Sequence, residues 1–560
     1  MKSLFRLGLP LLALLLGFSS AARAQQARRY FVYFKDKAGT PYQVSQPQAF
    51  LSARALARRS RQGIAVRARD LPVSAAYVAQ VKAVSGVQQV LYTSRWLNGA
   101  VVVGDSLTMT RVQLLPAVQS TRLLSLAPVL PPGPVVPVIP TPTPAVPTTA
   151  RAIYGKAYAQ TQLVGGVAMH NAGYRGEGMQ IAVFDGGFPG ADNITALQNL
   201  QQQGRILGTR NFVDGNRNAY VRNSHGTNCL SLIGGELPGY YVGLAPHASF
   251  YLCITEDVAT EYPVEEANWL AAAEYADSAG VDVISSSLGY TSFDARRLSH
   301  TYADLNGRTA IGSLAALGAA RAGMVVVSAA GNDGANSWHY IGVPADADSI
   351  VTVGAVDSLA AHAYFSSYGP TADGRIKPTL STMGAASAVL NGSGSVQRGN
   401  GTSYACPEMA GLVAAFWQAN PTLTAQQVIQ ALEAGASQAQ FPDNTLGYGI
   451  PNFVRAYNLL HASSPLDSMG AAGELPLAVY PNPGRPDQLT LALPASLRGK
   501  VLQVKVLDVR GALVATQTLP AGQDATAPLR PARTLSPGAY LCVVQPAAGG
   551  PSQSVRFVVQ

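Results

Sequence analysis

The feature that most constrains this fold is a proline-rich segment at residues 128–147, which contains nine prolines. Proline has no backbone N–H, so such a segment can neither continue a helix nor lie inside a sheet. We expect an extended linker over residues 128–150 that builds no core. The chain must therefore fold as separate units on the two sides of this linker, and its 560 residues suffice for several domains.

The first 24 residues have the features of a secretory signal peptide. Lys2 and Arg6 precede an apolar stretch at residues 7–18, and Ala22-Arg23-Ala24 fits a small-x-small cleavage site. The alternative, a membrane anchor, is disfavoured because the apolar stretch is too short to span a bilayer. We therefore predict an exported protein that begins at Gln25 after cleavage.

Residues 25–127, between the signal peptide and the linker, predict a small α+β domain. Short apolar strands are interrupted by two segments rich in helix-forming residues. We expect strands at 30–35, 87–92 and 97–103, and helices at 48–59 and 75–84.

Residues 151–462 predict an α/β fold in which helices cover both faces of a parallel sheet. Continuously apolar strands alternate with helices, the pattern of strands buried on both faces. We expect strands at 179–185, 249–255, 281–286, 324–330 and 349–356, and helices at 264–279, 307–322 and from the capping box of Thr424 and Gln427 onward.

A second linker, rich in Ser, Gly and Ala, is expected at residues 463–474. Beyond it, residues 475–560 carry short alternating strands between Pro and Gly turns, which indicates a small β-sandwich. The expected strands are 489–493, 502–509, 540–544 and 554–559.

The net charge of +9 is unevenly distributed along the chain. Residues 25–150 carry 14 basic and 3 acidic residues, whereas residues 151–462 carry 15 basic and 23 acidic ones. A basic protein usually suggests a nucleic-acid or membrane partner. Here the two oppositely charged blocks are neighbours in one chain, so we expect them to pair with each other and predict no nucleic-acid partner.

Four polar residues stand where strands end or helices begin. Asp185 and Asn332 each follow an apolar strand, His225 begins a predicted helix that runs to residue 233, and Ser403 precedes an Ala-rich helix. Pro407 is expected in the first turn of that helix, where a missing N–H costs nothing. Taken singly, these residues are ordinary turn formers and caps.

Together these four residues offer the parts of a nucleophilic site. Carboxyl ends of parallel strands meet at one edge of a sheet, so the four side chains are expected to converge. A serine hydroxyl becomes nucleophilic when a base removes its proton and an acid orients that base. The pattern predicts a nucleophile, a base, an orienting acid and an amide that stabilises an oxyanion.

The middle region resembles the subtilisin-like serine proteases (subtilases, peptidase family S8). The resemblance runs from Tyr154 to Leu460 and includes the order Asp, His, Ser. The motifs that carry it are Asp185-Gly-Gly, His225-Gly-Thr, Ser287-Leu288-Gly289, Ala329-Ala-Gly-Asn332, Val343-Pro-Ala, Phe365-Ser-Ser-Tyr-Gly-Pro370 and Gly401-Thr-Ser403. Two positions depart from the family pattern: Gly186, where Ser or Thr is common, and Glu408, where His is common.

The resemblance implies a role for each of these residues. Ser403 would attack the peptide carbonyl, His225 would transfer the proton, and Asp185 would orient the imidazole. Asn332, together with the Ser403 N–H, would hold the oxyanion. The segment Ser287-Leu288-Gly289 would pair with the substrate backbone and form a wall of the pocket for the P1 side chain.

The two flanking regions also resemble known domains. Residues 25–127 resemble the inhibitor-like propeptide of subtilases, which implies an intramolecular inhibitor. The tail, with Tyr480-Pro-Asn-Pro483 and Leu535-Ser-Pro-Gly-Ala-Tyr540, resembles the C-terminal sorting domain of the type IX secretion system of Bacteroidetes. A carbohydrate-binding or protein-binding β-sandwich is the alternative for the tail.

These observations predict a serine endopeptidase, secreted or attached to the cell surface and exported through the periplasm. Its partners would be protein or peptide substrates, its own propeptide and the type IX secretion machinery. The alternative is a catalytically silent surface-binding protein with the same fold. We expect no cofactor for the chemistry and no zinc site; structural calcium is common in the family, but we identify no local carboxylate cluster that would bind it.

Overall fold

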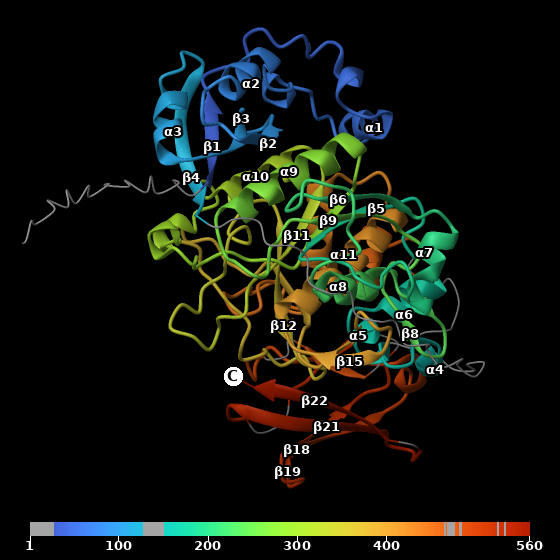
Figure 1. The fold of residues 1–560 in the computed structure, drawn as a ribbon. Helices are drawn as coiled ribbons and strands as arrows, with labels where there is room; N and C mark the ends of the chain where they lie inside the picture. Colours follow the sequence, from blue (N-terminus) through green and yellow to red (C-terminus); the bar gives the residue numbers. More distant parts are fainter. Residues whose placement is uncertain are drawn as a thin grey trace, which may run out of the picture.

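The computed structural model describes residues 27–126, 150–463, 466, 477–480, 484–522, 526–530, 534–550 and 552–559. The predicted signal peptide and almost all of the two predicted linkers lie outside these residues. Figure 1 shows three folded regions, with the N-terminal region above the central one and the C-terminal region below it. Within the described residues, no helix is both long and apolar enough to cross a membrane.

The N-terminal region is a four-stranded antiparallel sheet in the order β2-β3-β1-β4. Alternate residues of β1 face opposite ways: Tyr30, Val32 and Phe34 pack in a core with α2 and α3, whereas Phe31 packs against α9 and α10 of the central region. The elements are β1 Arg28–Phe34, α1 Ala53–Arg61, α2 Ala75–Lys82, β2 Gln89–Ser94, β3 Gly99–Gly104, α3 Ser106–Gln113 and β4 Val118–Ser125.

Three differences from the expected elements appear in this region. Helix α3 and strand β4 were not predicted, because their apolar residues are interleaved with Thr, Gln and Arg. The helix expected over 48–59 is instead a short 3₁₀ turn at Pro47–Ala49 followed by α1. Ser52 separates the two by accepting a hydrogen bond from the Ala55 N–H, as an N-cap residue does.

The central region contains a seven-stranded parallel sheet in the order β13-β12-β11-β10-β5-β9-β6, with helices on both faces, as predicted. The five predicted strands are present, and β6 and β13 are additional. The strands are β5 Gln180–Asp185, β6 Ile206–Asn211, β9 Ser249–Ile254, β10 Val283–Ser286, β11 Val325–Ala329, β12 Val351–Val356 and β13 Leu380–Met383.

Successive side chains of a strand point to opposite faces of the sheet, so the helices that they contact show which helices cover each face. Ile181 and Val183 of β5 pack in a core with α8 and α11, whereas Ala182 and Phe184 pack with α9 and α10. The helices are α4 Ala150–Tyr154, α5 Tyr158–Leu163, α6 Gly166–Asn171, α7 Gln198–Gln202, α8 His225–Gly234, α9 Val264–Ala279, α10 Ile311–Arg321, α11 Thr402–Ala419, α12 Ala425–Ala434 and α13 Phe453–Leu460.

The small strand pairs of the central region are β7 Glu236–Leu237 with β8 Tyr241–Val242, and β14 Ser387–Leu390 with β15 Val396–Gly399. The C-terminal region has two antiparallel sheets that share one apolar core, the arrangement of a sandwich. The sheets are formed by β16 Ala478–Tyr480, β17 Thr490–Ala492 and β20 Thr526–Pro528, and by β18 Leu502–Asp508, β19 Leu513–Leu519, β21 Gly538–Pro546 and β22 Gln553–Val559.

The N-terminal region holds the C-terminal end of α9 through buried ion pairs. Asp277 is fully buried and accepts hydrogen bonds from Arg58 at 2.5 Å, Arg59 at 2.8 Å and Arg95 at 2.7 Å. One turn earlier, Glu274 accepts from the Ser94 hydroxyl at 2.5 Å and the Arg95 N–H at 2.9 Å. We call this set of contacts the α9 clamp; its opposite charges are those expected from the charge distribution of the sequence.

The α9 clamp also satisfies backbone carbonyls that a helix leaves without partners at its C-terminus. Ser52 donates its N–H to the Ser278 carbonyl at 2.9 Å and its hydroxyl to the Ala279 carbonyl at 3.0 Å. Arg54 donates to the Gly280 carbonyl at 3.1 Å. Cations near a helix C-terminus also interact favourably with the helix dipole, so charge and hydrogen bonding favour the same docking.

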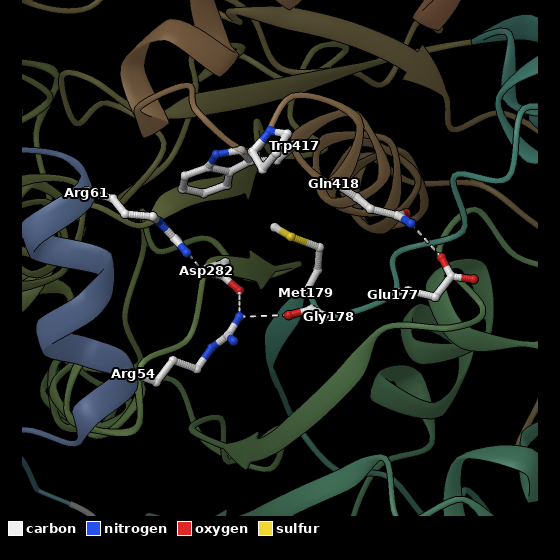
Figure 2. Close-up of a pocket in the computed structure, with 9 residues that line it drawn as sticks. Arg54, Arg61, Glu177, Gly178, Met179, Asp282, Trp417 and Gln418 are labelled. Carbon is white, nitrogen blue, oxygen red and sulfur yellow. Dashed lines mark hydrogen bonds and ion pairs between the residues drawn. The ribbon is translucent and has the colours of Figure 1, made fainter.

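A cavity of about 200 Å³ lies beside the α9 clamp, between α1 and the central region. Figure 2 shows Arg54 and Arg61 on its α1 side, both directed at Asp282, while Trp417 and Met179 line it with apolar surface. Arg54 also donates to the Gly178 carbonyl at 2.8 Å. Residue 178 lies two positions before β5 and residue 282 directly precedes β10, so this contact lies at the amino ends of the sheet strands.

Candidate active site

Asp185 and His225 are brought together by the end of β5 and the start of α8. The His225 Nδ1 lies 2.9 Å and 3.0 Å from the two carboxylate oxygens of Asp185. Asp185 is buried, and its Oδ1 also accepts from the Gly186 N–H at 2.8 Å. The close approach of α8 requires Gly226, because a Cβ there would lie 2.4 Å from the Gly187 carbonyl oxygen.

The carboxylate determines the protonation of the imidazole. Burial by itself lowers the pKa of His225, but the charge of Asp185, the neighbouring Cys229 and the hydrogen bonds to both together outweigh burial and raise that pKa well above its ordinary value. An imidazole held by a carboxylate at Nδ1 keeps its Nε2 available for a proton from another group. The pair can therefore serve as an oriented base. It can accept a proton only when the imidazole is neutral, so the fraction able to act as a base increases as pH rises.

Ser403 is the second residue of α11 and lies close to the same pair. The Cys229 thiol lies 3.7 Å from His225 Nδ1 and 3.4 Å from the Ser403 carbonyl oxygen. The next residue, Tyr404, has its ring centroid 5.8 Å from that of His225. The Ser403 hydroxyl donates to the Ser287 carbonyl at 3.4 Å and makes no hydrogen bond with the imidazole in the part of the chain described.

Pro407 differs from the prediction, because it lies in the second turn of α11 and not in the first. There its ring replaces an N–H that would bond to the carbonyl of residue 403. That carbonyl has other partners: the Ser287 hydroxyl donates to it at 2.8 Å, as does the Cys229 thiol at 3.4 Å.

The predicted binding residues and Ser403 line one cavity of about 220 Å³. Ser287, Leu288 and Gly289 line it just after β10, and Asn332 lines it after β11. The remaining lining residues are Thr291, Ala329, Gly331, Asp333, Gly342 and Thr402. The structure thus brings all seven predicted site residues to one edge of the sheet, although Asp185 and His225 lie outside the cavity itself.

Asn332 is oriented by the start of α11. Its side-chain oxygen accepts hydrogen bonds from the Thr402 N–H at 2.9 Å and the Thr402 hydroxyl at 3.1 Å. No described residue accepts a hydrogen bond from its Nδ2, which can therefore donate to a ligand in the cavity. Sequence reasoning missed two further residues of this cavity. Thr402 orients Asn332, and Asp333 is the single formally charged residue among the lining residues. The available signal was that each is adjacent in the sequence to a residue of a named motif.

Sequence reasoning also missed a carboxylate cluster close to this edge. Oxygens of Glu256, Glu261 and Glu265 all lie within 4.8 Å of one another. Burial first, and then the like charges of the neighbouring acids, raises the pKa of Glu256 and of Glu265. Tyr290 donates to Glu256 at 3.1 Å, and the Asp257 N–H donates to Glu265 at 3.1 Å.

Oxygen atoms are the ligands that calcium prefers, so the three glutamates are the described residues best suited to hold a hard cation. Hydrogen bonds and retained protons also account for the cluster without an ion. The signal available in the sequence was the pair Glu261 and Glu265, which are four positions apart. Glu261 lies in the segment between β9 and α9, and Glu265 lies in the first turn of α9.

Three family descriptions match separate parts of this chain. The subtilase family matches residues 176–449. The peptidase S8 propeptide domain of Bacteroidota matches residues 29–129, and the secretion system C-terminal sorting domain matches residues 478–560. The order of the three matches is that of the predicted domains.

Bacterial proteases are similar to the central region. Subtilisin NAT of Bacillus subtilis subsp. natto is 32% identical over 286 residues, which cover 50% of this chain and 66% of that protein, just under two thirds of its length. Subtilisin DY of Bacillus licheniformis is 31% identical over 271 residues, covering 47% of this chain and 86% of that protein. Serine protease AprX of Bacillus subtilis is 31% identical over 311 residues, covering 50% of this chain and 65% of that protein.

The matches therefore extend beyond the local motifs to most of the length of a subtilisin chain. They cover the parallel sheet at whose edge Asp185, His225 and Ser403 lie. A propeptide domain precedes this region and a secretion sorting domain follows it. The chain belongs to the subtilase family of serine-type endopeptidases.

Proposed function

We propose that this protein is a serine endopeptidase that hydrolyses peptide bonds of extracellular proteins through Ser403, His225 and Asp185. The observation that supports this most is the double contact of His225 Nδ1 with the Asp185 carboxylate beside a cavity lined by Ser403. A carboxylate in that position fixes the imidazole tautomer and stabilises its charged form.

In this proposal, Ser403 Oγ attacks the carbonyl carbon of the scissile peptide while His225 Nε2 takes the hydroxyl proton. The same proton then passes to the leaving amine, which gives an acyl-enzyme. Water attacks the ester with His225 again as the base, and this step releases the acid product and restores Ser403. The chemistry uses side chains and N–H donors and requires no cofactor.

The oxyanion formed in each step needs preorganised donors. Asn332 Nδ2 is suited to this task because Thr402 holds the other end of the amide. The backbone N–H of Ser403, near the N-terminus of α11, is the second donor in the proposal and lies at the positive end of the helix dipole. Substrate backbone would pair along Ser287, Leu288 and Gly289, with the P1 side chain in the cavity.

The N-terminal region would act as the inhibitor of this enzyme before activation. Its support is the match to a propeptide domain and the α9 clamp, which joins it to the central region by buried ion pairs. The sorting domain implies secretion or attachment to the cell surface. We propose that the type IX secretion machinery recognises this domain after passage through the periplasm.

A fluorophosphonate probe tests the proposed function. We expect the activated protein to be labelled once, at Ser403, and to cleave an unfolded protein substrate. Ser403→Ala should lose both properties, whereas Ser286→Ala, which changes the neighbouring strand, should keep them. Absence of labelling in the activated wild-type protein would instead favour a catalytically silent surface-binding protein.

A further inference from the structure

Ser287 and Ser403 contact each other through two hydrogen bonds of opposite direction. The Ser287 hydroxyl donates to the Ser403 carbonyl at 2.8 Å, and the Ser403 hydroxyl donates to the Ser287 carbonyl at 3.4 Å. Ser287 is itself buried and directly follows β10, the central strand of the seven-stranded sheet. The proposed nucleophile is therefore held against a rigid element and not only by its own helix.

This contact exists because Pro407, in the second turn of α11, removes a hydrogen bond that would otherwise close on the carbonyl of residue 403 in the first turn. A helix normally satisfies the carbonyl of residue 403 with the N–H of residue 407, which proline lacks. The proline ring also crowds that carbonyl and turns it away from the helix axis. A buried carbonyl without a partner is costly, and the Ser287 hydroxyl supplies the missing donor.

We propose that Ser287 is a positioning residue for Ser403, because its hydroxyl replaces the N–H that Pro407 removes. By holding the carbonyl of residue 403, it fixes the peptide plane that follows the nucleophile and so the direction of Oγ. The Cys229 thiol, 3.4 Å from the same carbonyl, is a secondary donor. This inference rests on the proposed function for its catalytic consequence, but the hydrogen bond can be tested without catalysis.

The kinetic test is a double-mutant cycle on the activated enzyme with Ser287→Ala and Pro407→Ala. With the natural Pro407 present, Ser287→Ala removes one positioning hydrogen bond. This change should lower kcat about threefold to tenfold and leave KM within about twofold. Pro407→Ala restores a helical N–H to the carbonyl, so Ser287→Ala should then lower kcat by less than about twofold. Equal losses in both backgrounds would overturn the proposal.

Ser286→Ala is the matched control. Its hydroxyl lies one residue away and accepts a hydrogen bond from Trp269 Nε1 at 2.9 Å, so its loss perturbs the same strand without touching Ser403. We expect a lower melting temperature with kcat retained. If Ser286→Ala lowers kcat as much as Ser287→Ala does, the effect belongs to the strand and the proposal is wrong.

A second cycle separates failure of this inference from failure of the proposed function. Ser403→Ala removes the hydroxyl but keeps the carbonyl, so the full chain with that substitution can be unfolded thermally without self-digestion. Ser287→Ala should lower its melting temperature more with Pro407 present than with Ala at that position. If the effect of Ser287→Ala on melting temperature depends on residue 407 but the wild-type protein has no activity, only the proposed enzymatic function is rejected. If the wild-type protein is active but the effect of Ser287→Ala is independent of residue 407 in both cycles, only the positioning role is rejected.

Discussion

The two ends of α9 carry buried acids in opposite electrostatic surroundings. At the C-terminal end, burial acts to raise the pKa of Asp277, but Arg58, Arg59 and Arg95 outweigh it and the pKa lies below its ordinary value. At the N-terminal end, burial raises the pKa of Glu265, and the neighbouring Glu256 raises it further. Burial is common to both ends, so the charge of the neighbours decides whether an acid stays ionised.

This difference separates two roles for buried acids. Asp277 remains charged and can attach the N-terminal region at neutral pH, since three guanidinium groups compensate its desolvation. The three glutamates at the other end can be accommodated by retaining protons. Asp185 has a different kind of partner, because the charge of His225 itself depends on pH.

The largest expected effect is on the Asp185–His225 pair. Asp185→Asn removes the charge that raises the pKa of His225, and we expect kcat to fall about 10⁴-fold. Because His225 must be neutral to act as a base, its raised pKa places the acidic limb of the activity profile at a higher pH than for an ordinary histidine. In the variant, that limb should move to lower pH; a pH profile of kcat/KM that keeps the wild-type limb would contradict this assignment.

Next in size is the effect of breaking the charged end of α9. Asp277→Ala leaves Arg58 and Arg95 without their buried acid, although Arg59 keeps Asp70 at 3.3 Å. Breaking a buried pair in this way costs about 3–5 kcal/mol. The cleaved N-terminal region should then bind about 10²–10⁴-fold more weakly, as measured by its co-elution with the central region. Arg61→Ala is the control, because its side chain is exposed and lies 4.0 Å from Asp282; equal loss there would contradict a specific α9 clamp.

A smaller effect, on the pH dependence of folding stability, is expected at the N-terminal end of α9, where Glu265 lies. The pKa of Glu265 is raised in the folded chain, so the unfolded chain releases this proton first as pH rises above its ordinary value near 4.3. Folding stability therefore falls with rising pH until the folded-state pKa is passed. Glu265→Gln in the Ser403→Ala chain should flatten the dependence of melting temperature on pH between about 5 and 8.

Asp277→Asn provides the opposite control for that measurement. Its lowered pKa contributes stability that is present above the unfolded-state pKa and is lost as pH falls through the folded-state value. The substitution should therefore change the acidic side of the stability profile and leave its slope above pH ~5 unaltered. A similar change of slope in both variants would remove the distinction between the two ends.

The smallest effect is expected from Asp333, an acid that is only partly buried and has no cationic partner among the described residues. Asp333 lines the cavity half-buried, and its Oδ1 accepts from Asn336 at 2.8 Å, with no ion pair among the described residues. Its charge should favour a P1 lysine over glutamine. Asp333→Asn should reduce that preference by about twofold to fivefold in kcat/KM, less at high salt. An unchanged ratio would show that the carboxylate does not reach the P1 side chain.

The sequence predicts the fold well where local patterns are strong. Five apolar strands of the central sheet and the helices α8 and α9 were expected at nearly their observed bounds, and the Thr424–Gln427 capping box is present. Strand β6 was missed because its residues Gly208, Thr209 and Arg210 break the apolar run, and they are tolerated only because β6 is an edge strand.

The site was predictable in its members but not in its contacts. Strand ends are encoded locally, so Asp185 and Asn332 could be placed at one edge of the sheet. The reciprocal hydrogen bonds of Ser287 and Ser403 join residues 116 positions apart, and the glutamate cluster depends on how the β9–α9 loop folds back. Such contacts arise from tertiary packing, which no local pattern records.

The position of the α9 clamp has a consequence for timing. Helix α9 has 16 residues and is about 24 Å long, and the clamp holds its end at the amino edge of the sheet, opposite the edge that carries Ser403. Cutting the backbone beside Ser403 would leave every one of these distant ion pairs intact. Under the proposed function, cleavage of the backbone and release of the N-terminal region would thus be two separate events, and the interval between them would delay the start of proteolysis outside the cell.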